Sequence, residues 1–499
     1  KAYKRFFEEY LKPRGGAGLR DPLSLGLLPP LEGLYREELE EPGLWDGFRS
    51  NPLHRRLDTV DGVLLSHAHL DHSGYISFLK PDIPVFSTAT TAFVSKAMQD
   101  SGRSDFDQNV CYFPSVDRRA PPGWKQEAFL SDSRRPKRQR QFCIADRDPD
   151  ALGEESLHFW QHGFWKKSSK QTPLESRSLQ RHDGRDVNAR CFPVDHSIPG
   201  ACAWAFQTSS GWIVYSGDLR LHGSAGHLTR AFMEQAAQLR PTALILEGTN
   251  AMRQGNTFEQ EVYENSLKAV SRCTGLVIAD FPARDADRLT TFLQVARETG
   301  RKLAITPKRA YLLKTLRLLD PTLPDVACSE DIAVYQDTRA TTDGWMRGLC
   351  EECQANTIVA RDVASAQDQF ILCFNFFDIN DLPSILPRPG SLYLFSSSEP
   401  HDEEQEIDFR RLHNWIRHFD LTPFGLPVEM NGVWEILEEQ KGLHASGHAC
   451  GPDLLEVART INPRCLIPIH SEQPEFYQEN LAGSGIEVRL PKAGGSLTI

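Results

Sequence analysis

The 499-residue chain lacks several features that mark other classes of protein. No stretch approaches the roughly 18 consecutive apolar residues of a membrane-spanning helix, so we expect no membrane partner. No signal peptide is found, and the eleven cysteines follow no disulfide-framework spacing. We therefore expect reduced thiols and a cytoplasmic location, or a nuclear one in a eukaryote.

Positive charge is also in short supply. The chain has 56 Lys and Arg against 67 Asp and Glu, a net charge of −11. This argues against a surface covered with phosphate-binding residues, but a nucleic-acid enzyme with a local basic channel stays open. One basic run, "RRPKRQRQ" (134–141), lies near Trp160, Phe164 and Trp165. A solvated surface is the favoured interpretation, and a nucleic-acid contact is the alternative.

Histidine, in contrast, is concentrated in one short motif. The apolar run that ends at Leu65 stops abruptly in "LLSHAHLDHSG" (64–74). Three histidines and one aspartate fall within six positions there, and imidazole and carboxylate are good zinc ligands. A packed apolar core has no use for such a cluster. The motif therefore predicts a metal site formed by His67, His69, Asp71 and His72.

Three later residues complete a plausible ligand set, each after a short apolar stretch. They are His196 in "PVDHSIPG", Asp218 in "YSGDLRLHG" and His470 in "IPIHSE". Strand ends deliver such residues to one edge of a sheet. One ion would take His67, His69 and His196. A second would take Asp71, His72 and His470, with Asp218 bridging the two. Ions about 3.5–4 Å apart can share a water, lower its pKa and stabilise both attacking and leaving oxygens.

The wider pattern predicts an α/β protein. Strands are expected at 61–65, 83–88 and 242–248, a helix at 90–100 and a strand pair within 201–218. Residues 103–190 are polar and irregular, and we interpret them as an insertion or a set of loops. From 257 to 430, helical and strand patterns alternate, which indicates an inserted α/β domain. A helix and a strand are expected within 442–472, and a hairpin-like tail at 485–499.

The motif "HAHLDH" resembles the signature of the metallo-β-lactamase superfamily, and His196, Asp218 and His470 match its later ligand motifs in order. The long segment between "LILEGTN" and "HASGHA" resembles the β-CASP insertion of the nuclease branch. Glu247, His448 and His470 fall at that branch's acidic, second and third motifs. "SLGLLPPLEGLYR" (24–36) and "HASGHA…INPRCLIPIHSE" are similar to ribonuclease J.

The resemblance implies a four-layer αββα metallo-β-lactamase fold with an inserted α/β β-CASP domain. The first part of the core would span 1–250, with the insertion at about 103–190. The β-CASP domain would span 251–430, and the second part of the core 431–499. Two Zn²⁺ are expected, with Mn²⁺ as the alternative.

The resemblance also assigns roles to residues. Asp71, Glu247 and His448 would be catalytic, with Glu247 holding the tautomer of His448 and raising its pKa. The loop ahead of the helix at about 452–460 would bind a phosphate of the substrate, since backbone N–H groups near a helix start suit an anion. Its predicted phosphate-binding residues are His444, Ser446, Gly447 and His448.

The implied function is metal-dependent hydrolysis of single-stranded RNA. In this branch the third motif is typically His in enzymes acting on RNA, and the chain has His470. Similarity to ribonuclease J favours 5′-to-3′ exonuclease action, with endonuclease cuts as an additional activity. The alternatives are a DNA nuclease of the same branch, a small-molecule ester or lactone hydrolase, and a binding or scaffold protein without activity.

Overall fold

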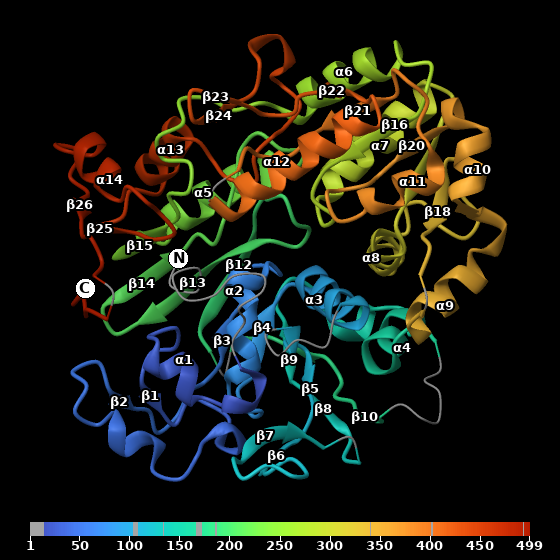
Figure 1. Cartoon of the computed structure of the whole chain (residues 1–499). Helices are drawn as coiled ribbons and strands as arrows, with labels where there is room; N and C mark the ends of the chain where they lie inside the picture. Colours follow the sequence, from blue (N-terminus) through green and yellow to red (C-terminus); the bar gives the residue numbers. More distant parts are fainter. Residues whose placement is uncertain are drawn as a thin grey trace.

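Three β-sheets organise the described part of the chain (Figure 1). The structure is a computed structural model, and it describes residues 14–102, 108–132, 134–165, 172–184, 187–339, 341–400, 403–492 and 494–499. Two of the sheets belong to the part that carries the histidine motif. The third uses only strands between residues 277 and 424.

The first sheet has four parallel strands in the order β11-β9-β4-β3. Its strands are short, and the central ones are buried on both faces, as expected of a parallel sheet covered on each side. Their bounds are β3 Val63–Leu64, β4 Val85–Ser87, β9 Phe142–Ile144 and β11 Gln180–Arg181.

The second sheet has six strands in the order β12-β13-β14-β15-β25-β26. The β12-β13-β14 meander is antiparallel, and the remaining neighbours pair in parallel. Their bounds are β12 Ala189–Pro193, β13 Cys202–Thr208, β14 Gly211–Tyr215, β15 Ala243–Leu246, β25 Cys465–Pro468 and β26 Glu487–Val488.

The two sheets pack face to face. Phe86 and Cys143 of the first sheet meet Cys202 and Trp204 of the second in one buried cluster. The indole Nε1 of Trp204 donates a hydrogen bond to the carbonyl of Leu65 at 3.1 Å, which ties the second sheet to the chain just before the histidine motif.

Helices cover the outer faces of both sheets. Helices α3 (Ala89–Ser101) and α4 (Glu154–His162) pack on the four-stranded sheet, and α5 (Gly226–Gln238) and α13 (Gly451–Ile461) on the six-stranded one. Helix α3 begins where the Thr88 side chain accepts a hydrogen bond from the Thr91 amide at 3.0 Å, a standard N-cap. The predicted four-layer αββα arrangement is confirmed.

The third sheet has seven strands, all parallel, in the order β19-β18-β17-β20-β16-β21-β22. The βαβ alternation in the sequence predicted an inserted α/β domain here, and the parallel pairing agrees with it, because parallel neighbours need helical crossovers. Its strands are β16 Val277–Asp280, β17 Lys302–Ile305, β18 Ile332–Gln336, β19 Thr357–Val359, β20 Phe370–Leu372, β21 Leu392–Phe395 and β22 Thr422–Phe424.

Helices lie on both faces of this sheet. Helices α6, α7 and α8 cover one face of the sheet. Their apolar side chains belong to the same buried cluster as those of α3 and α4, so the α/β unit packs directly on the helices of the first sheet. The other face packs against α10 to α12. The bounds are α6 Glu259–Val270, α7 Ala286–Glu298, α8 Pro307–Arg317, α9 Gly344–Glu352, α10 Ala360–Ser365, α11 Leu382–Ile385 and α12 Glu403–His418. Domain limits at 250 and 430 stay a prediction.

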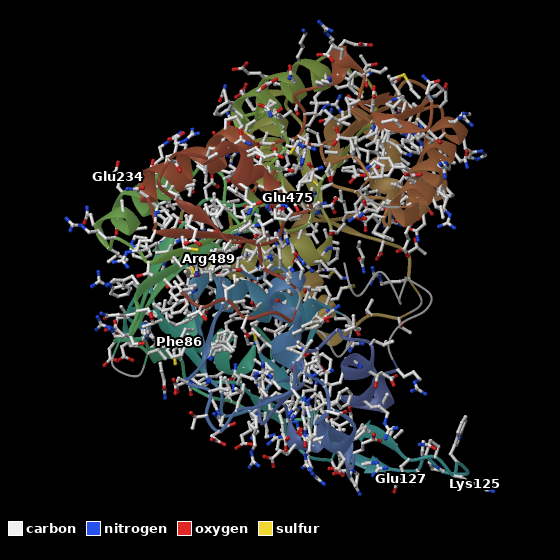
Figure 2. The ribbon with its side chains drawn as sticks, turned by 90° about the vertical axis from the view of Figure 1, so that its left-hand side faces the viewer. Phe86, Lys125, Glu127, Glu234, Glu475 and Arg489 are labelled. Atoms are coloured by element: carbon white, nitrogen blue, oxygen red, sulfur yellow. The ribbon has the colours of Figure 1, made fainter. Side chains whose placement is uncertain are left out.

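Short elements complete the described structure. Lys125 and Glu127 lie at the tip of the protruding β6–β7 hairpin, where the Trp124 side chain is 72% exposed (Figure 2). The remaining helices are α1 Arg20–Ser24, α2 Leu70–Ser73 and α14 Glu475–Asn480. The remaining strands are β1 Leu31–Glu32, β2 Arg55–Arg56, β5 Tyr112–Phe113, β6 Val116–Arg119, β7 Ala128–Ser131, β8 Lys137–Gln139, β10 Leu174–Glu175, β23 Val428–Met430 and β24 Val433–Glu435.

Two expectations from the sequence are wrong. Residues 103–190 are not only loops, because they supply β9 and β11 of the four-stranded sheet and helix α4. These strands have three and two residues, too few to show an alternating pattern. The end of the chain does not form a hairpin in the described residues, because β26 pairs in parallel with β25.

The basic run 134–141 is largely occupied within the fold. Arg140 is fully buried and donates to the carbonyls of Ser77, Leu79 and Lys80. Arg138 pairs with Glu38. The nearby aromatic residues pack inward too, since Trp160 is 1% exposed and Phe164 and Trp165 pack around Tyr311. A nucleic-acid contact built on this run is therefore not supported. No helix among the described residues has the length and apolar character to cross a membrane.

Candidate metal centre and phosphate loop

Seven side chains predicted as metal ligands converge on one place. Potential ligand atoms lie within 4.8 Å of one another in each of three overlapping groups. The groups are His67, His69 and His196; His67, His72 and Asp218; and Asp71, His72 and His470. Asp218 thus lies between the two sets that the sequence predicted for two ions. Their role as ligands stays a prediction.

Short strands and tight turns deliver these residues. His67 and His69 follow β3, and Asp71 and His72 lie in α2, which begins directly after His69. Asp218 follows β14 through Gly217, whose backbone has φ +59°, a left-handed conformation that favours glycine. A Cβ at Gly217 would lie 2.8 Å from the Cβ of Ser66, so the glycine lets Asp218 approach the histidine motif.

The other two ligand positions come from distant parts of the chain. His196 follows β12, and His470 follows β25 in the same six-stranded sheet. His470 has φ 48°, which is unusual for a residue with a side chain. Such strain is found where the surrounding structure requires one particular side-chain position.

Burial keeps most of the imidazoles neutral. It lowers the pKa of His67 and His196 well below the usual value, and neighbouring histidines lower both further. Burial also lowers the pKa of His69 to about 4. A neutral imidazole retains a lone pair on one ring nitrogen, which is the form that binds a metal.

The two carboxylates stay ionised. Burial alone would raise the pKa of Asp71, but a hydrogen bond with His470 and the charges of His72 and His69 lower it to about 2. Burial likewise opposes the pKa shift of Asp218, yet His72, His448 and His67 lower it far below its usual range. Two anions beside the neutral imidazoles of His67, His69 and His196 make a site that a divalent cation would stabilise.

The hydrogen bonds around the imidazoles also fit a metal. His67 is fully buried, and its Nε2 has no hydrogen-bond partner. The Nε2 of His196 lies 3.2 Å from Nδ1 of His69, while its Nδ1 donates to the carbonyl of Gly447 at 2.6 Å. Nδ1 of His470 is held by the Thr249 hydroxyl at 2.7 Å. Such outer contacts fix the ring orientation and leave the other nitrogen for a cation. The residues present therefore fit a metal centre.

The buried Glu247 pairs with the partly exposed His448 beside this cluster. Oε2 of Glu247 accepts a hydrogen bond from Nδ1 of His448 at 2.8 Å, and Oε1 accepts from the Leu219 amide at 2.7 Å. Burial alone would lower the pKa of His448, but the Glu247 carboxylate outweighs it and the pKa rises to about 9. His448 is therefore a cation at neutral pH, and its ring stacks 5.8 Å from that of His470.

The loop that carries Ser446 and Gly447 lies against the same histidines. The Ser446 hydroxyl accepts hydrogen bonds from Nδ2 of Asn250 at 2.8 Å and from the His448 amide at 3.2 Å. A Cβ at Gly447 would lie 2.5 Å from Oγ of Ser197 and 3.1 Å from Cε1 of His196, so this backbone approaches the cluster as closely as only glycine allows.

His444 differs from the other predicted phosphate-binding residues. Its Nδ1 is buried without a hydrogen-bond partner. Burial, and then the charges of Arg288 and Arg253, keep the pKa of His444 well below its usual value. His444 is therefore neutral, and it would contact an anion only as a neutral N–H donor.

Sequence reasoning missed the residues that support the predicted ones. Thr249 and Asn250 lie two and three residues after Glu247 in "LEGTN". Their position just after a strand could have marked them as site residues. His222 was also missed, although its Nε2 donates to the carbonyl of Ser446 at 3.0 Å. Two buried arginines, Arg220 and Arg288, also contact the loop, and nothing in the local sequence marks them.

Known proteins are similar to parts of this chain. A family model described as "Zn-dependent metallo-hydrolase RNA specificity domain" matches residues 439–491, which include the loop 443–447 and His470. A crystal structure of a protein of unknown function from Enterococcus faecalis is similar over 98% of this chain and 91% of that chain, with a TM-score of 0.61 and 19% identity. At that identity the likeness shows the fold alone.

Several relatives are ribonuclease J proteins. The chain is 25% identical to that of Mycoplasma genitalium over 292 residues, which is 56% of this chain and 45% of the relative. It is 22% identical to that of Mycobacterium tuberculosis over 431 residues, 83% of this chain and 59% of the relative. For Sinorhizobium meliloti the identity is 24% over 317 residues, 62% and 50% of the two chains. These matches span about half the length of the relatives.

Proposed function

Because the chain belongs to the metallo-β-lactamase superfamily, in its β-CASP, ribonuclease-J-like branch, we propose that it is a metal-dependent hydrolase of phosphodiester bonds in single-stranded RNA. The observation that carries the proposal is one juxtaposition. The cationic His448, paired with Glu247, lies directly beside the cluster of potential metal ligands.

The proposed cofactor is a pair of Zn²⁺ ions, with Mn²⁺ as the alternative. His67, His69 and His196 would hold one ion, and Asp71, His72 and His470 the other, with Asp218 between them. When bound, such ions polarise a phosphoryl oxygen and make water acidic enough to supply a nucleophile at neutral pH.

The chain's own residues would bind and orient the phosphate. Backbone amides around Gly447 and the start of α13 would face the anion, which a helix N-terminus and its preceding loop favour. His448 would donate a charged hydrogen bond from Nε2 to a phosphoryl oxygen or to the leaving oxygen, because its Nδ1 is engaged by Glu247. Glu247 holds that tautomer and orientation, and so acts through His448.

RNA is the proposed substrate, and two features support it. The family model whose description includes RNA specificity covers both the phosphate loop and His470. The relatives are ribonucleases by name. We further propose 5′-to-3′ exonuclease action with additional endonuclease cuts.

End-labelled RNA tests this proposal. The purified chain, supplied with Zn²⁺ or Mn²⁺, would be incubated with single-stranded RNA carrying a 5′-monophosphate, 5′-triphosphate or 5′-hydroxyl, and with DNA of matched sequence. We expect mononucleotides from the 5′-monophosphorylated RNA and little cleavage of DNA. Uniform internal cuts would replace the exonuclease proposal with an endonuclease one. Preferential cleavage of DNA, or hydrolysis of simple esters with no action on RNA, would overturn the substrate assignment.

A further inference from the structure

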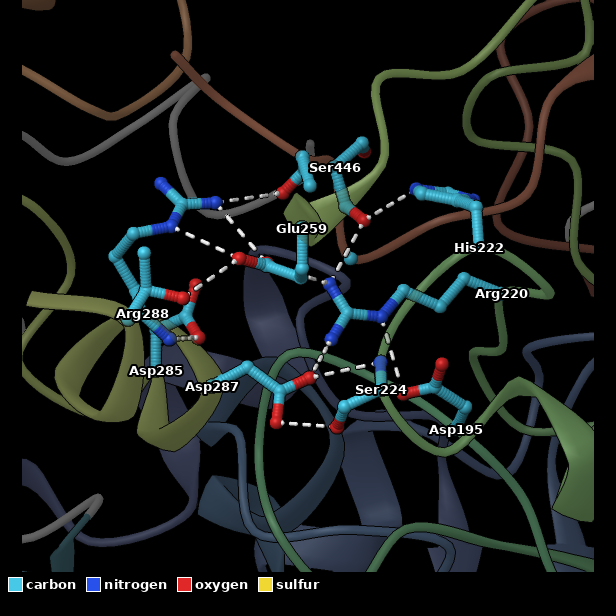
Figure 3. A network of polar contacts seen from close by, with 12 residues as sticks. Asp195, Arg220, His222, Ser224, Glu259, Asp285, Asp287, Arg288 and Ser446 are labelled. Carbon is cyan, nitrogen blue, oxygen red and sulfur yellow. Dashed lines mark hydrogen bonds and ion pairs between the residues drawn. The ribbon is translucent and has the colours of Figure 1, made fainter. Parts of the chain in front are cut away.

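Two fully buried arginines donate hydrogen bonds to backbone carbonyls of the loop 443–447 (Figure 3). Arg220 comes from the turn after Asp218, in the αββα core. Arg288 comes from α7, in the α/β unit. Neither belongs to the ligand cluster, yet both contact carbonyl groups of the loop that would take the phosphate.

Arg220 joins three parts of the chain. Its Nη1 donates to the carbonyl of Ser446 at 3.2 Å, and His222 donates to the same carbonyl. Its Nε pairs with Asp195 at 3.1 Å, directly before His196, and its Nη2 pairs with Asp287 of α7 at 2.5 Å. One guanidinium thus connects the phosphate loop, the His196 turn and the α/β unit.

Arg288 holds the adjoining residues of the loop. Its Nη1 donates to the carbonyl of Leu443 at 3.3 Å and its Nη2 to that of Ala445 at 3.4 Å. Glu259 of α6 lies between the arginines, 3.2 Å from Nη2 of Arg288 and 3.6 Å from Nη1 of Arg220. Arg220, Arg288 and Glu259 therefore form one charged network, which Figure 3 shows next to Ser446 of the loop.

This arrangement fixes the direction of the loop's amides. In a trans peptide the C=O and the following N–H point in opposite directions, and the described chain has no cis peptide. With the carbonyls of residues 443, 445 and 446 turned towards the arginines, the amides of residues 444, 446 and 447 turn away from them. Successive amides on one side of a loop, here those of residues 446 and 447, form a concavity that binds anions.

We propose that Arg220 and Arg288 are positioning residues for the substrate phosphate: by holding these carbonyls they present the amides of residues 444, 446 and 447 to the anion. Glu259 and Asp287, which belong to the α/β unit, pair with the same arginines. The loop therefore takes this shape only when the α/β unit is packed against the core. The inference rests on the proposed function, since the anion is a phosphate of the RNA.

The test compares Arg220→Lys and Arg288→Lys with a matched control. Lysine keeps the charge but cannot reproduce the fork that reaches several acceptors at once. The control is Arg301→Lys. Arg301 also donates hydrogen bonds to three carbonyls, those of Gly275, Phe370 and Cys273, but it lies at the start of the seven-stranded sheet, away from the loop. Metal content and melting temperature would be measured for all three. Asp287→Asn serves as a milder variant if either lysine variant fails to fold.

Two readouts separate positioning from general stability. For the loop variants we expect kcat/KM on single-stranded RNA to fall roughly 10- to 100-fold, mainly through KM, with metal content unchanged. In hydrogen–deuterium exchange with inorganic phosphate as the probe, wild-type protein should show slowed exchange at residues 443–448, and the loop variants should lose that protection. Arg301→Lys should melt earlier but keep both the wild-type KM and the protection.

The outcomes distinguish the two proposals. If wild-type protein cleaves RNA and the loop variants match Arg301→Lys in KM and in phosphate protection, the positioning role is wrong and the proposed function stands. If wild-type protein does not cleave RNA, the proposed function fails. Exchange with phosphate then decides the inference, because protection lost only in the loop variants supports the anion-binding geometry and unchanged protection overturns it.

Discussion

Two buried polar regions lie side by side in this protein, and they differ in whether their charges are satisfied. In the cluster of potential ligands, the Nε2 of His67 has no hydrogen-bond partner, and burial lowers the pKa of His67 and His196 well below the usual value. In the neighbouring network, Arg220 faces Asp195, Asp287 and Glu259, and their charges raise its pKa although burial opposes the shift. The first region gathers carboxylates and imidazole nitrogens around one point, whereas in the second region arginines and carboxylates pair with one another.

This difference indicates different roles. Buried polar groups without partners are costly, and a protein retains them where a ligand completes them. A network whose arginines and carboxylates pair with one another holds its members in one arrangement. We therefore expect changes in the first region to remove the chemistry, and changes in the second to alter geometry and leave the metal in place.

Removing the central carboxylate should have the largest effect. Asp218→Ala deletes the group that lies between both sets of histidines, so we expect loss of bound zinc and of RNA cleavage to background. Elemental analysis of the purified protein measures the metal, and a cleavage assay with excess Zn²⁺ measures the activity. Full metal content in Asp218→Ala would contradict the assigned ligand set.

His448→Ala tests the cation next to the cluster. The change removes a proposed donor to the phosphate but no proposed metal ligand, so we expect kcat to fall by roughly 10²- to 10⁴-fold with zinc retained. Single-turnover cleavage of labelled RNA measures the loss. Activity near that of wild type would show that His448 has no part in the reaction.

Glu247→Gln should have a smaller effect than His448→Ala. The amide preserves the shape and can still accept the hydrogen bond from Nδ1 of His448, but it no longer carries the charge that favours the imidazolium. We expect an intermediate fall in kcat, unchanged metal content and little change in KM. If Glu247→Gln were as impaired as His448→Ala, Glu247 would have a role of its own beyond orienting the imidazole.

Asp280→Asn extends the comparison to a third case, a buried carboxylate whose hydrogen-bond partner, Tyr393, is neutral. Oδ2 of Asp280 accepts a hydrogen bond from the Tyr393 hydroxyl at 2.5 Å, and burial raises the pKa of Asp280 to about 7. Since the folded-state pKa lies above the unfolded value of 3.8, its contribution to stability is complete below about pH 4 and is lost as the pH rises through 7.

Asp280→Asn should therefore be more stable than wild type at pH 8, and its unfolding free energy should depend less on pH between 5 and 8. The difference between the proteins at pH 8 should be at most a few kcal/mol, and RNA cleavage should be unchanged. Calorimetry at matched metal concentration measures it. A wild-type protein whose stability rises from pH 5 to pH 8 relative to the variant would show that Asp280 ionises readily.

The sequence predicted which side chains converge, because they are rare residue types with visible local context, and their role as metal ligands stays a prediction. His67, His69, Asp71 and His72 follow one short apolar run, and His196, Asp218 and His470 each follow another. The α/β character of residues 257–430 was predicted from alternating helical and strand patterns in the sequence. Strands β9 and β11 were missed because segments of two or three residues carry no period.

The arginine network could not be predicted in the same way. Arginine is usually a surface residue, and nothing next to Arg220 or Arg288 in the sequence indicates burial. Arg220 meets Ser446 across 226 positions, and Arg288 meets Leu443 across 155. Two of their partners, Glu259 and Asp287, come from helices of the α/β unit, whose place on the core is a property of the whole fold.

The sequence by itself determined which chemistry the chain carries, because metal ligands, an acid–histidine pair and a glycine-containing loop are recognisable as residue types in order. Only the tertiary structure decided which polar residues are left unsatisfied for a ligand and which neutralise one another. That distinction depends on distance and burial, since a charge is stabilised by whatever lies within a few ångströms in space, wherever it stands in the chain.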